Sequence, residues 1–252
     1  MQKKRWLKDT LFLLAALLLL PAGARAARNQ FQKDSIRVDG GRRITYWVYA
    51  PQEEPVPGLP LVVYLHGSGE RGERALSGGM PALLNEGKIA VPAVCLVPQL
   101  PQGMIWGHIE SQLLAMMDRV SAAYRTDENR VTLVGASLGA NAVWDLAARW
   151  PDLFPRAVSV CGRVRQEIQP ESLAYCHIRA YVGLKDVSVP PGSAMAFTQA
   201  LMDAGYEAEL FEYDAAHAPT QRKVFSDQQI IDWICWAEQE TDVTGETETV
   251  LK

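Results

Sequence analysis

Residues 130–139 read RVTLVGASLG, an apolar run that leads into the pattern Gly135-Ala136-Ser137-Leu138-Gly139. The run predicts a buried strand. The glycines on either side of Ser137 predict a sharp turn into a helix, because small residues let the two backbones pass close together. A serine in such a turn has a strained backbone and an exposed hydroxyl at the edge of a sheet. The pattern also fits a plain strand-to-helix turn, so the rest of the chain must decide between a nucleophile and a turn.

The rest of the chain alternates apolar strands with helical segments after an N-terminal hairpin. Continuous runs of β-branched residues between helices predict strands buried on both faces, hence a mostly parallel sheet. We expect one doubly wound α/β domain at residues 27–240, with an eight-stranded sheet, helices on both faces and no large lid. The expected strands are 35–38, 43–49, 61–65, 94–97, 131–134, 157–160, 178–182 and 207–213, and the expected helices are 109–123, 138–149, 194–204 and 227–238.

Residues 1–26 do not fit this core. Four of the first eight residues are basic, and the apolar run 11–20 is followed by Ala24-Arg25-Ala26. This order predicts a signal peptide with an A-x-A cleavage site, and therefore a secreted or periplasmic protein without a stable membrane anchor. The alternative is an uncleaved anchor, which is disfavoured because a membrane span needs about 20 apolar residues.

Cleavage would make the chain more acidic. It removes five positive charges and one negative charge, so the net charge moves from −4 to −8. There is neither a basic stripe nor a nucleic-acid motif, so we expect no nucleic-acid partner. Residues 241–252 contain few large apolar residues and predict a disordered acidic tail.

The four cysteines allow disulfides in an exported protein, with three possible full pairings. We expect mostly free, buried thiols instead. Cys95 lies in a predicted strand and Cys235 in an apolar helix, while Cys161 and Cys176 fall at opposite ends of two neighbouring strands. None has the spacing of a metal site, and we expect neither a metal nor a cofactor.

A serine nucleophile needs a histidine base and an acid that orients the base. In a parallel sheet such groups gather at the carboxyl ends of the strands. Of the four histidines, only His66 and His217 lie at the carboxyl ends of predicted strands, whereas His108 precedes a helix and His177 precedes a strand. His217 comes after the last strand, which predicts the base, although a solvated loop residue is the simpler reading of a single histidine.

Two aspartates compete for the role of the acid. Asp186 follows the strand 178–182, between the serine and the histidine in sequence. Asp214 is closer to His217, but a residue on the same loop is less able to reach behind the ring. We therefore favour Asp186 and keep Asp214 as the alternative.

The sequence His66-Gly67-Ser68-Gly69 ends the strand 61–65. Glycines there let backbone N–H groups face developing negative charge, so the N–H groups of Ser68 and Leu138 are predicted to form an oxyanion hole. We expect His66, Gly67, Gly69 and Trp106 to contact the substrate. The alternative for this segment is a tight turn without chemistry.

With these motifs in family order, the chain resembles the α/β-hydrolase superfamily. Within it the chain is similar to secreted esterases of the dienelactone-hydrolase-like and feruloyl-esterase-like ("predicted peptidase") group. The resemblance implies hydrolysis of a carboxylic ester through an acyl-enzyme on Ser137. It rests on residues 61–72 (LVVYLHGSGERG), 97–99 with Trp106, 127–131, 135–139, 150–154 (WPDLF), 161–162, Asp186 and His217.

The chain departs from that pattern in three places. Ala140 stands where relatives usually have a second glycine, and Pro219-Thr220-Gln221 where they often carry an aromatic residue. Dienelactone hydrolases proper have a cysteine nucleophile, so Ser137 argues against their substrate.

The segment between Cys161 and Ile178 has only 16 residues, which leaves no room for a lid domain. An open crevice suits a small-molecule or polysaccharide-linked ester better than lipid droplets. Two other functions stay open at this point: a serine peptidase of the prolyl-oligopeptidase type, whose propeller domain has no room before residue 61, and a non-catalytic binding protein on the same scaffold.

Overall fold

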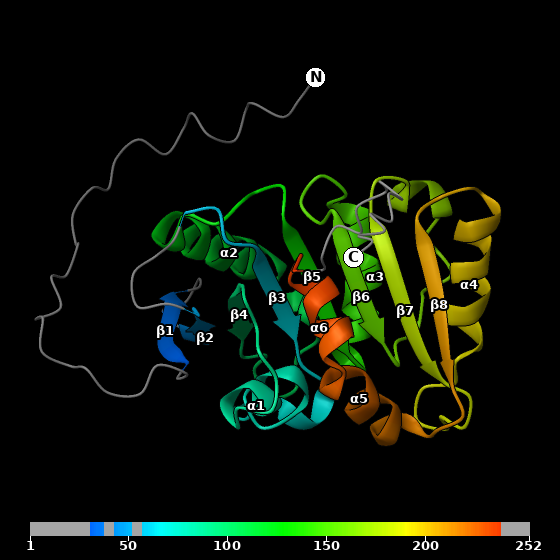
Figure 1. The fold of residues 1–252 in the computed structure, drawn as a ribbon, viewed down its shortest axis with the longest axis horizontal. Coiled ribbons are helices and arrows are strands. Elements are labelled where there is room, and N and C mark those ends of the chain that lie inside the picture. The colour runs from blue at the N-terminus through cyan, green and yellow to red at the C-terminus, as the bar shows by residue number, and fades with distance from the viewer. Residues whose placement is uncertain (1–30, 38–42, 52–56, 238–252) are drawn as a thin grey trace, which may run out of the picture.

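The structure is a computed structural model of the chain, and it describes residues 31–37, 43–51 and 57–237 (Figure 1). The signal peptide expected at residues 1–26 and the acidic tail expected at 241–252 lie outside the described residues.

The described strands form one eight-stranded sheet in the order β1-β2-β4-β3-β5-β6-β7-β8 (Figure 1). β2 pairs antiparallel with both β1 and β4, and every other pair of neighbours is parallel. The predicted eight-stranded, mostly parallel sheet is therefore confirmed. The strands are β1 (Gln32–Arg37), β2 (Arg43–Tyr49), β3 (Leu61–Leu65), β4 (Val94–Pro98), β5 (Val131–Ala136), β6 (Arg156–Val160), β7 (His177–Gly183) and β8 (Ala208–Tyr213).

Alternation along β3 explains why its apolar run is unbroken. Leu61, Val63 and Leu65 pack into the core on one face of the sheet, while Val62 and Tyr64 pack into the core on the other. Successive side chains of a strand point to opposite faces, so every position of a strand that is buried on both sides favours an apolar residue.

Helices cover both faces of the sheet (Figure 1). α2 (Glu110–Tyr124), α3 (Leu138–Arg149) and α4 (Gly192–Asp203) contribute to one core, and α1 (Gly79–Asn85), α5 (His217–Ser226) and α6 (Gln228–Ile234) to the other. The connection between β6 and β7 holds only the short 3-10 helix η4 (Pro170–Leu173), and no large lid is present among the described residues.

Two described helices were not expected from the sequence. α1 begins at Gly79 beside a second glycine, and α5 begins at His217 itself, in a segment expected to be a loop. Pro219 is the third residue of α5, a position that proline tolerates because the first turn of a helix has no internal partner for its N–H groups. The expected helix 227–238 is shorter in the structure. α6 begins after Asp227, which caps it by accepting a hydrogen bond from the Gln229 N–H, and it ends at Ile234, two residues before Trp236 adopts a positive φ of 57°.

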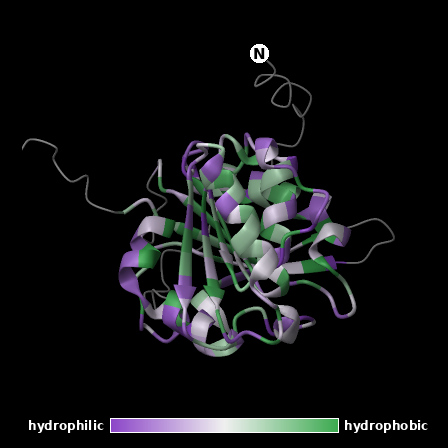
Figure 2. Cartoon of the chain, turned by 90° about the vertical axis from the view of Figure 1, so that its right-hand side faces the viewer, coloured by the Kyte–Doolittle hydropathy of each residue, from purple (hydrophilic) through white to green (hydrophobic). Residues whose placement is uncertain are grey.

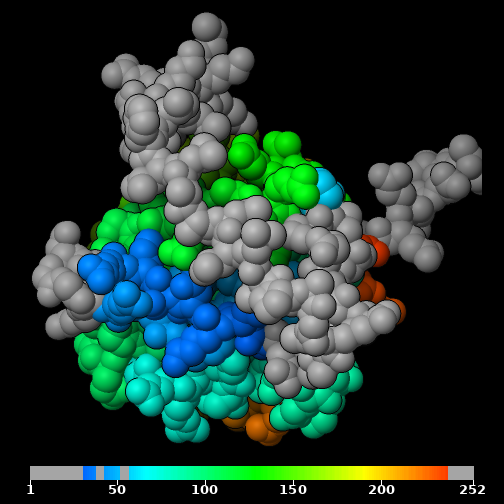
Figure 3. All heavy atoms as spheres, turned by 90° about the vertical axis from the view of Figure 1, so that its left-hand side faces the viewer, coloured from blue at the N-terminus to red at the C-terminus, as the bar shows by residue number. Residues whose placement is uncertain are grey.

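The two edges of the sheet lie on opposite sides of the molecule. The N-terminal hairpin β1–β2 lies across the side shown in Figure 3 (blue). Figure 2 views the opposite side, where the edge strand β8 is partly exposed and hydrophilic residues are mixed with hydrophobic ones. None of the described helices combines the length and the hydropathy that a membrane crossing requires.

The cysteines are buried, as predicted from their places in the strands and helices. Cys95, Cys161 and Cys176 are free thiols. Cys161 follows the carboxyl end of β6 and Cys176 precedes β7, so these two cysteines lie at opposite edges of the sheet.

Candidate active site

Ser137 has the strained backbone expected of a nucleophile elbow. It joins β5 to α3 with φ 54° and ψ −113°, a conformation that a residue with a side chain rarely adopts. Both neighbouring glycines are required by close packing. A Cβ at Gly139 would lie 1.9 Å from the carbonyl oxygen of Leu65, and one at Gly135 would lie 2.4 Å from the backbone of Gly139. The prediction that these two glycines let the strand and helix backbones pass close together is therefore confirmed.

Ala140, which replaces the second glycine of relatives, is accommodated by a glycine elsewhere. A Cβ at Gly162 would lie 2.7 Å from the Ala140 methyl group. The space for that methyl group therefore depends on Gly162 at the end of β6.

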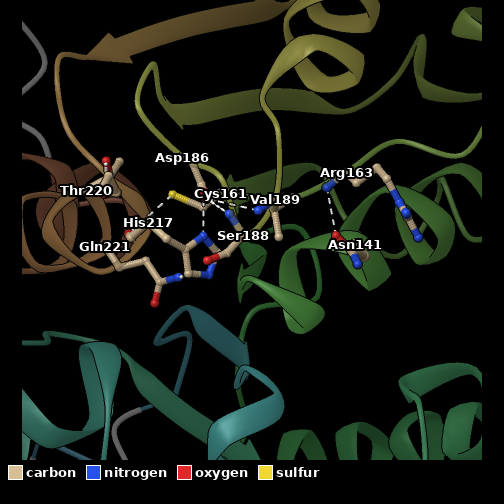
Figure 4. Close-up of polar contacts among 10 residues, drawn as sticks. Asn141, Cys161, Arg163, Asp186, Ser188, Val189, His217, Thr220 and Gln221 are labelled. Carbon is tan, nitrogen blue, oxygen red and sulfur yellow. Dashed lines mark hydrogen bonds and ion pairs between the residues drawn. The ribbon is translucent and has the colours of Figure 1, made fainter.

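Asp186 and His217 form a direct pair beyond the ends of β7 and β8. Oδ2 of Asp186 lies 2.5 Å from Nδ1 of His217, and Oδ1 accepts hydrogen bonds of 2.9 Å from the N–H groups of Ser188 and Val189 (Figure 4). Asp186 is only 4% exposed. Its carboxylate is therefore fixed on both oxygens, and it orients the ring so that Nε2 faces outward.

Asp214 does not contact this ring. Its carboxylate forms an ion pair of 2.8 Å with Lys185, and both side chains are largely exposed. Of the two aspartates considered from the sequence, only Asp186 is hydrogen-bonded to His217.

The end of β6 connects the elbow to this pair. The Ser137 N–H donates to the carbonyl of Val160 over 2.9 Å. Cys161 comes next in the chain, and its sulfur lies 3.7 Å from the carbonyl oxygen of His217 (Figure 4). The serine and the histidine therefore both lie beside the carboxyl end of β6, at one edge of the sheet.

The outer nitrogen of His217 has a partner that the sequence did not suggest. Nε2 of the ring lies 3.0 Å from the side-chain amide nitrogen of Gln221, whereas the Ser137 hydroxyl has no hydrogen bond to any described residue. Gln221 is four residues after His217 on α5, so both lie on the same side of that helix. The i, i+4 spacing of His217 and Gln221 could have indicated this contact, but only if residues 217–226 had been predicted to form a helix.

Backbone N–H groups flank Ser137 on two sides. Gly67 packs against the serine, because a Cβ added to this glycine would lie 3.4 Å from the Ser137 Cβ. Ser68 begins the 3-10 helix η2 (Ser68–Glu70), and Leu138 begins α3. The first N–H of a helix has no acceptor inside that helix, so both groups are available to a ligand. Ser68 and Gly69 are exposed at this edge.

His66 is not accessible to a substrate, which corrects the expectation that it contacts one. It is fully buried; Nδ1–H donates to the Gly67 carbonyl over 2.8 Å, and Nε2 accepts from the Leu100 N–H over 3.1 Å. Burial lowers the pKa of His66 to about 4, so the ring is neutral. It holds the loop that contains Gly67 against the chain that follows β4.

Trp106 is corrected in the same way. Its ring is 1% exposed, and Nε1–H donates to the His66 carbonyl over 3.2 Å. Gln99 joins this buried network, since its amide nitrogen donates to the Glu70 carbonyl over 2.8 Å. These side chains support the Gly67–Gly69 loop from behind and do not face a substrate.

Neither of the other two histidines is hydrogen-bonded to Ser137, Asp186 or His217 among the described residues. His108 is exposed on the 3-10 helix η3 (Trp106–Ile109), and His177 at the start of β7 is 2.8 Å from Glu209.

Cys161, Asp186 and His217 place three possible metal ligands within 4.8 Å of one another. Two of them already form a hydrogen bond with each other. Burial, reinforced by the Asp186 carboxylate, raises the pKa of the Cys161 thiol to about 12, whereas a metal ligand must be a thiolate. The set is therefore better suited to a hydrogen-bonded base than to a metal ion.

A protein-family model described as the dienelactone hydrolase family matches residues 98–231, more than half of the chain. The chain belongs to the dienelactone hydrolase family. The matched region includes the elbow, Asp186 and His217. Membership of the dienelactone hydrolase family agrees with the α/β-hydrolase fold seen in the eight-stranded, mostly parallel sheet.

Solved structures of esterases share the fold of this member of the dienelactone hydrolase family. A thermostable esterase is 21% identical with a TM-score of 0.69, over 82% of this chain and 62% of that one. The feruloyl esterase module of Clostridium thermocellum is 13% identical with a TM-score of 0.61, over 80% of this chain and 87% of that one. A ferulic acid esterase of Anaeromyces mucronatus is 16% identical with a TM-score of 0.59, over 80% and 90%.

The chain thus spans 62% of the length of the thermostable esterase. At these identities the likeness shows a common fold. A comparison with curated protein sequences gives no match.

Proposed function

We propose that the protein is a serine carboxylesterase that forms an acyl-enzyme on Ser137, with His217 as the base and Asp186 as the acid. The observation that supports this most is the 2.5 Å hydrogen bond between Asp186 and His217, at the same sheet edge as a serine with a strained elbow backbone. Membership of the dienelactone hydrolase family supports ester cleavage.

In the acylation step, Nε2 of His217 accepts the hydroxyl proton of Ser137 while Oγ attacks the acyl carbon of the ester. The Asp186 carboxylate stabilises the imidazolium ion that results, and the ring then gives its proton to the leaving alcohol. This step requires His217 to exchange its hydrogen bond with Gln221 for one with Ser137.

The negative charge on the acyl oxygen is met by the N–H groups of Ser68 and Leu138. Such donors already point at the position of the charge, so the protein does not have to rearrange as the charge develops. The loss of one donor typically costs ~3 kcal/mol of transition-state stabilisation. In the second step Nε2 of His217 takes a proton from a water molecule, whose oxygen attacks the acyl carbon. The bond between this carbon and Oγ then breaks, the ring gives that proton to Ser137, and the carboxylic acid leaves.

The substrates that we propose are small soluble esters or acyl groups linked to a larger carrier such as a polysaccharide. The connection between β6 and β7 is short, and no large lid covers the site among the described residues. Leu184 and Val187, on either side of Asp186 in the sequence, are 47% and 91% exposed and offer apolar surface near the proposed acid. Ser137 in place of a cysteine argues against dienelactones as the substrate.

We also propose that residues 1–26 direct export to the periplasm or the medium. N-terminal sequencing of the protein recovered from those fractions tests this. We expect a chain that begins at Ala27. A protein that keeps Met1 and stays in the cytoplasm would contradict export but not the esterase reaction.

The esterase reaction is tested with 4-nitrophenyl acetate and a Ser137→Ala variant. We expect the wild type to hydrolyse this ester and the variant to be slower in kcat by at least about 10³-fold. Equal rates in the two proteins would overturn the role of Ser137, and no hydrolysis by the wild type would overturn the proposed function.

A further inference from the structure

The Gln221 side chain occupies the position at which His217 must act. Its amide nitrogen is 3.0 Å from Nε2 of the ring, and Figure 4 shows it beside the ring on the side away from Asp186. Gln221 is partly buried, and it is held one helical turn from His217 by α5.

The orientation of this amide follows from the other ring nitrogen. Because the Asp186 carboxylate can only accept, Nδ1 of His217 carries the ring proton, and Nε2 of the neutral ring is an acceptor. Gln221 must therefore present its NH₂ group to Nε2 and turn its carbonyl oxygen away. The resting base is paired with a donor.

This pairing has to break in the reaction proposed above. Nε2 first receives the proton of Ser137 and then delivers it to the oxygen of the leaving alcohol. A group within hydrogen-bond distance of Nε2 therefore lies beside that oxygen once it has moved aside. We propose, on the basis of the esterase function, that Gln221 is a specificity-determining residue on the leaving-group side that favours esters whose alcohol carries a hydroxyl near the ester oxygen.

The preference comes from the hydrogen bond that Gln221 gives up. A hydroxyl on the alcohol can accept from the displaced NH₂ group or donate to the carbonyl oxygen of Gln221, so it replaces the lost bond. A plain alkyl alcohol cannot, and the partly buried amide is then left unsatisfied. The chemistry itself is unchanged: the proton passes from Ser137 to His217 to the alkoxide, a bond forms between Oγ and the acyl carbon, the alkoxy bond breaks, and Gln221 neither gains nor loses a proton.

The experiment compares 2-hydroxyethyl acetate with ethyl acetate. Both esters give the same acyl-enzyme, and kcat/KM reports the steps up to its formation, so the ratio of the two kcat/KM values isolates the alcohol. We expect this ratio to fall roughly threefold to tenfold in Gln221→Leu, which is the factor that one neutral hydrogen bond contributes. Gln221→Ala should give the same direction.

Gln199→Leu is the matched control. Gln199 is an exposed glutamine on α4 that bonds to Asp203 four residues later, away from the crevice. We expect it to leave the ratio unchanged. Because both esters are measured on one preparation, partial unfolding of a variant cancels from the ratio.

An unchanged ratio in both Gln221 variants would overturn the inference while leaving the esterase function intact. A wild type that hydrolyses neither acetate ester nor 4-nitrophenyl acetate would instead show that the proposed function has failed, and the role of Gln221 with it.

Discussion

The Asp186 carboxylate accepts a hydrogen bond of 2.5 Å from Nδ1 of His217, although 31 residues separate the two in sequence. Asp186→Asn should therefore lower kcat for 4-nitrophenyl acetate by roughly 10³- to 10⁴-fold, because an amide no longer stabilises the charged ring and favours the wrong tautomer. Steady-state kinetics at neutral pH measures this.

Asp214→Asn is the control for that variant. Asp214 pairs with Lys185 at the surface, so we expect kcat to stay within about twofold of the wild type. A large loss in Asp214→Asn together with a small one in Asp186→Asn would reassign the acid.

The elbow glycines should be intolerant of a methyl group. Gly139→Ala would bring a Cβ to 1.9 Å from the Leu65 carbonyl oxygen, and backbone on both sides has little room to shift. We expect the free energy of unfolding to fall by about 3 kcal/mol or more, at or above the upper end of the usual cost of overpacking. Urea denaturation measures it.

Gly192→Ala is the matched control on α4. A Cβ there meets nothing within 4 Å, so this variant should be neutral or more stable by up to about 1 kcal/mol. Equal destabilisation in the two variants would contradict the close passage of α3 and β3.

His66 should make stability depend on pH. Burial lowers its pKa from 6.5 to about 4, so the unfolded chain binds a proton that the folded protein does not. The contribution of the neutral ring is complete above pH 6.5 and is lost as the pH falls toward 4, by about 3 kcal/mol in all.

Denaturation of the wild type and of His66→Gln between pH 7 and pH 4 measures this contribution. We expect the variant to lose less stability over that window, while His108→Gln, a change at an exposed site, follows the wild type. Parallel curves for His66→Gln and the wild type would show that His66 is charged or exposed.

Cys161 should be inert although it lies beside the base. Its thiol is buried, and its pKa is raised to about 12, as is that of Cys176. Iodoacetamide at pH 8 should therefore leave both thiols unmodified in the native protein and alkylate them in urea, as read by peptide mass spectrometry. Alkylation of native Cys161 at the rate of a free thiol would contradict this environment.

The sequence was most informative where local packing decides the structure. The apolar run of β5 and the glycines at 135 and 139 predicted the strand, the turn and the helix α3, because backbones that pass this closely exclude every larger residue. Asp186 and His217 were then predicted as partners for Ser137 because each follows a later strand at the same edge of the sheet.

Tertiary contacts decided the rest. Nothing local distinguishes a histidine that ends a strand and faces a crevice from one that turns inward, so the buried role of His66 was not foreseen. The choice between Asp186 and Asp214 depends on which carboxylate reaches behind the ring across two loops. The helix α5, which contains Pro219, was not predicted, so the position of Gln221 beside His217 was not predicted either.

The central claim, that Ser137 is the acylated nucleophile, is tested most directly by peptide mass spectrometry after treatment with a serine-directed fluorophosphonate. We predict one adduct per chain, on Ser137, with loss of ester hydrolysis in proportion to labelling and no adduct in Ser137→Ala. Complete labelling at another residue, or full hydrolysis of 4-nitrophenyl acetate by a protein labelled on Ser137, would contradict the account.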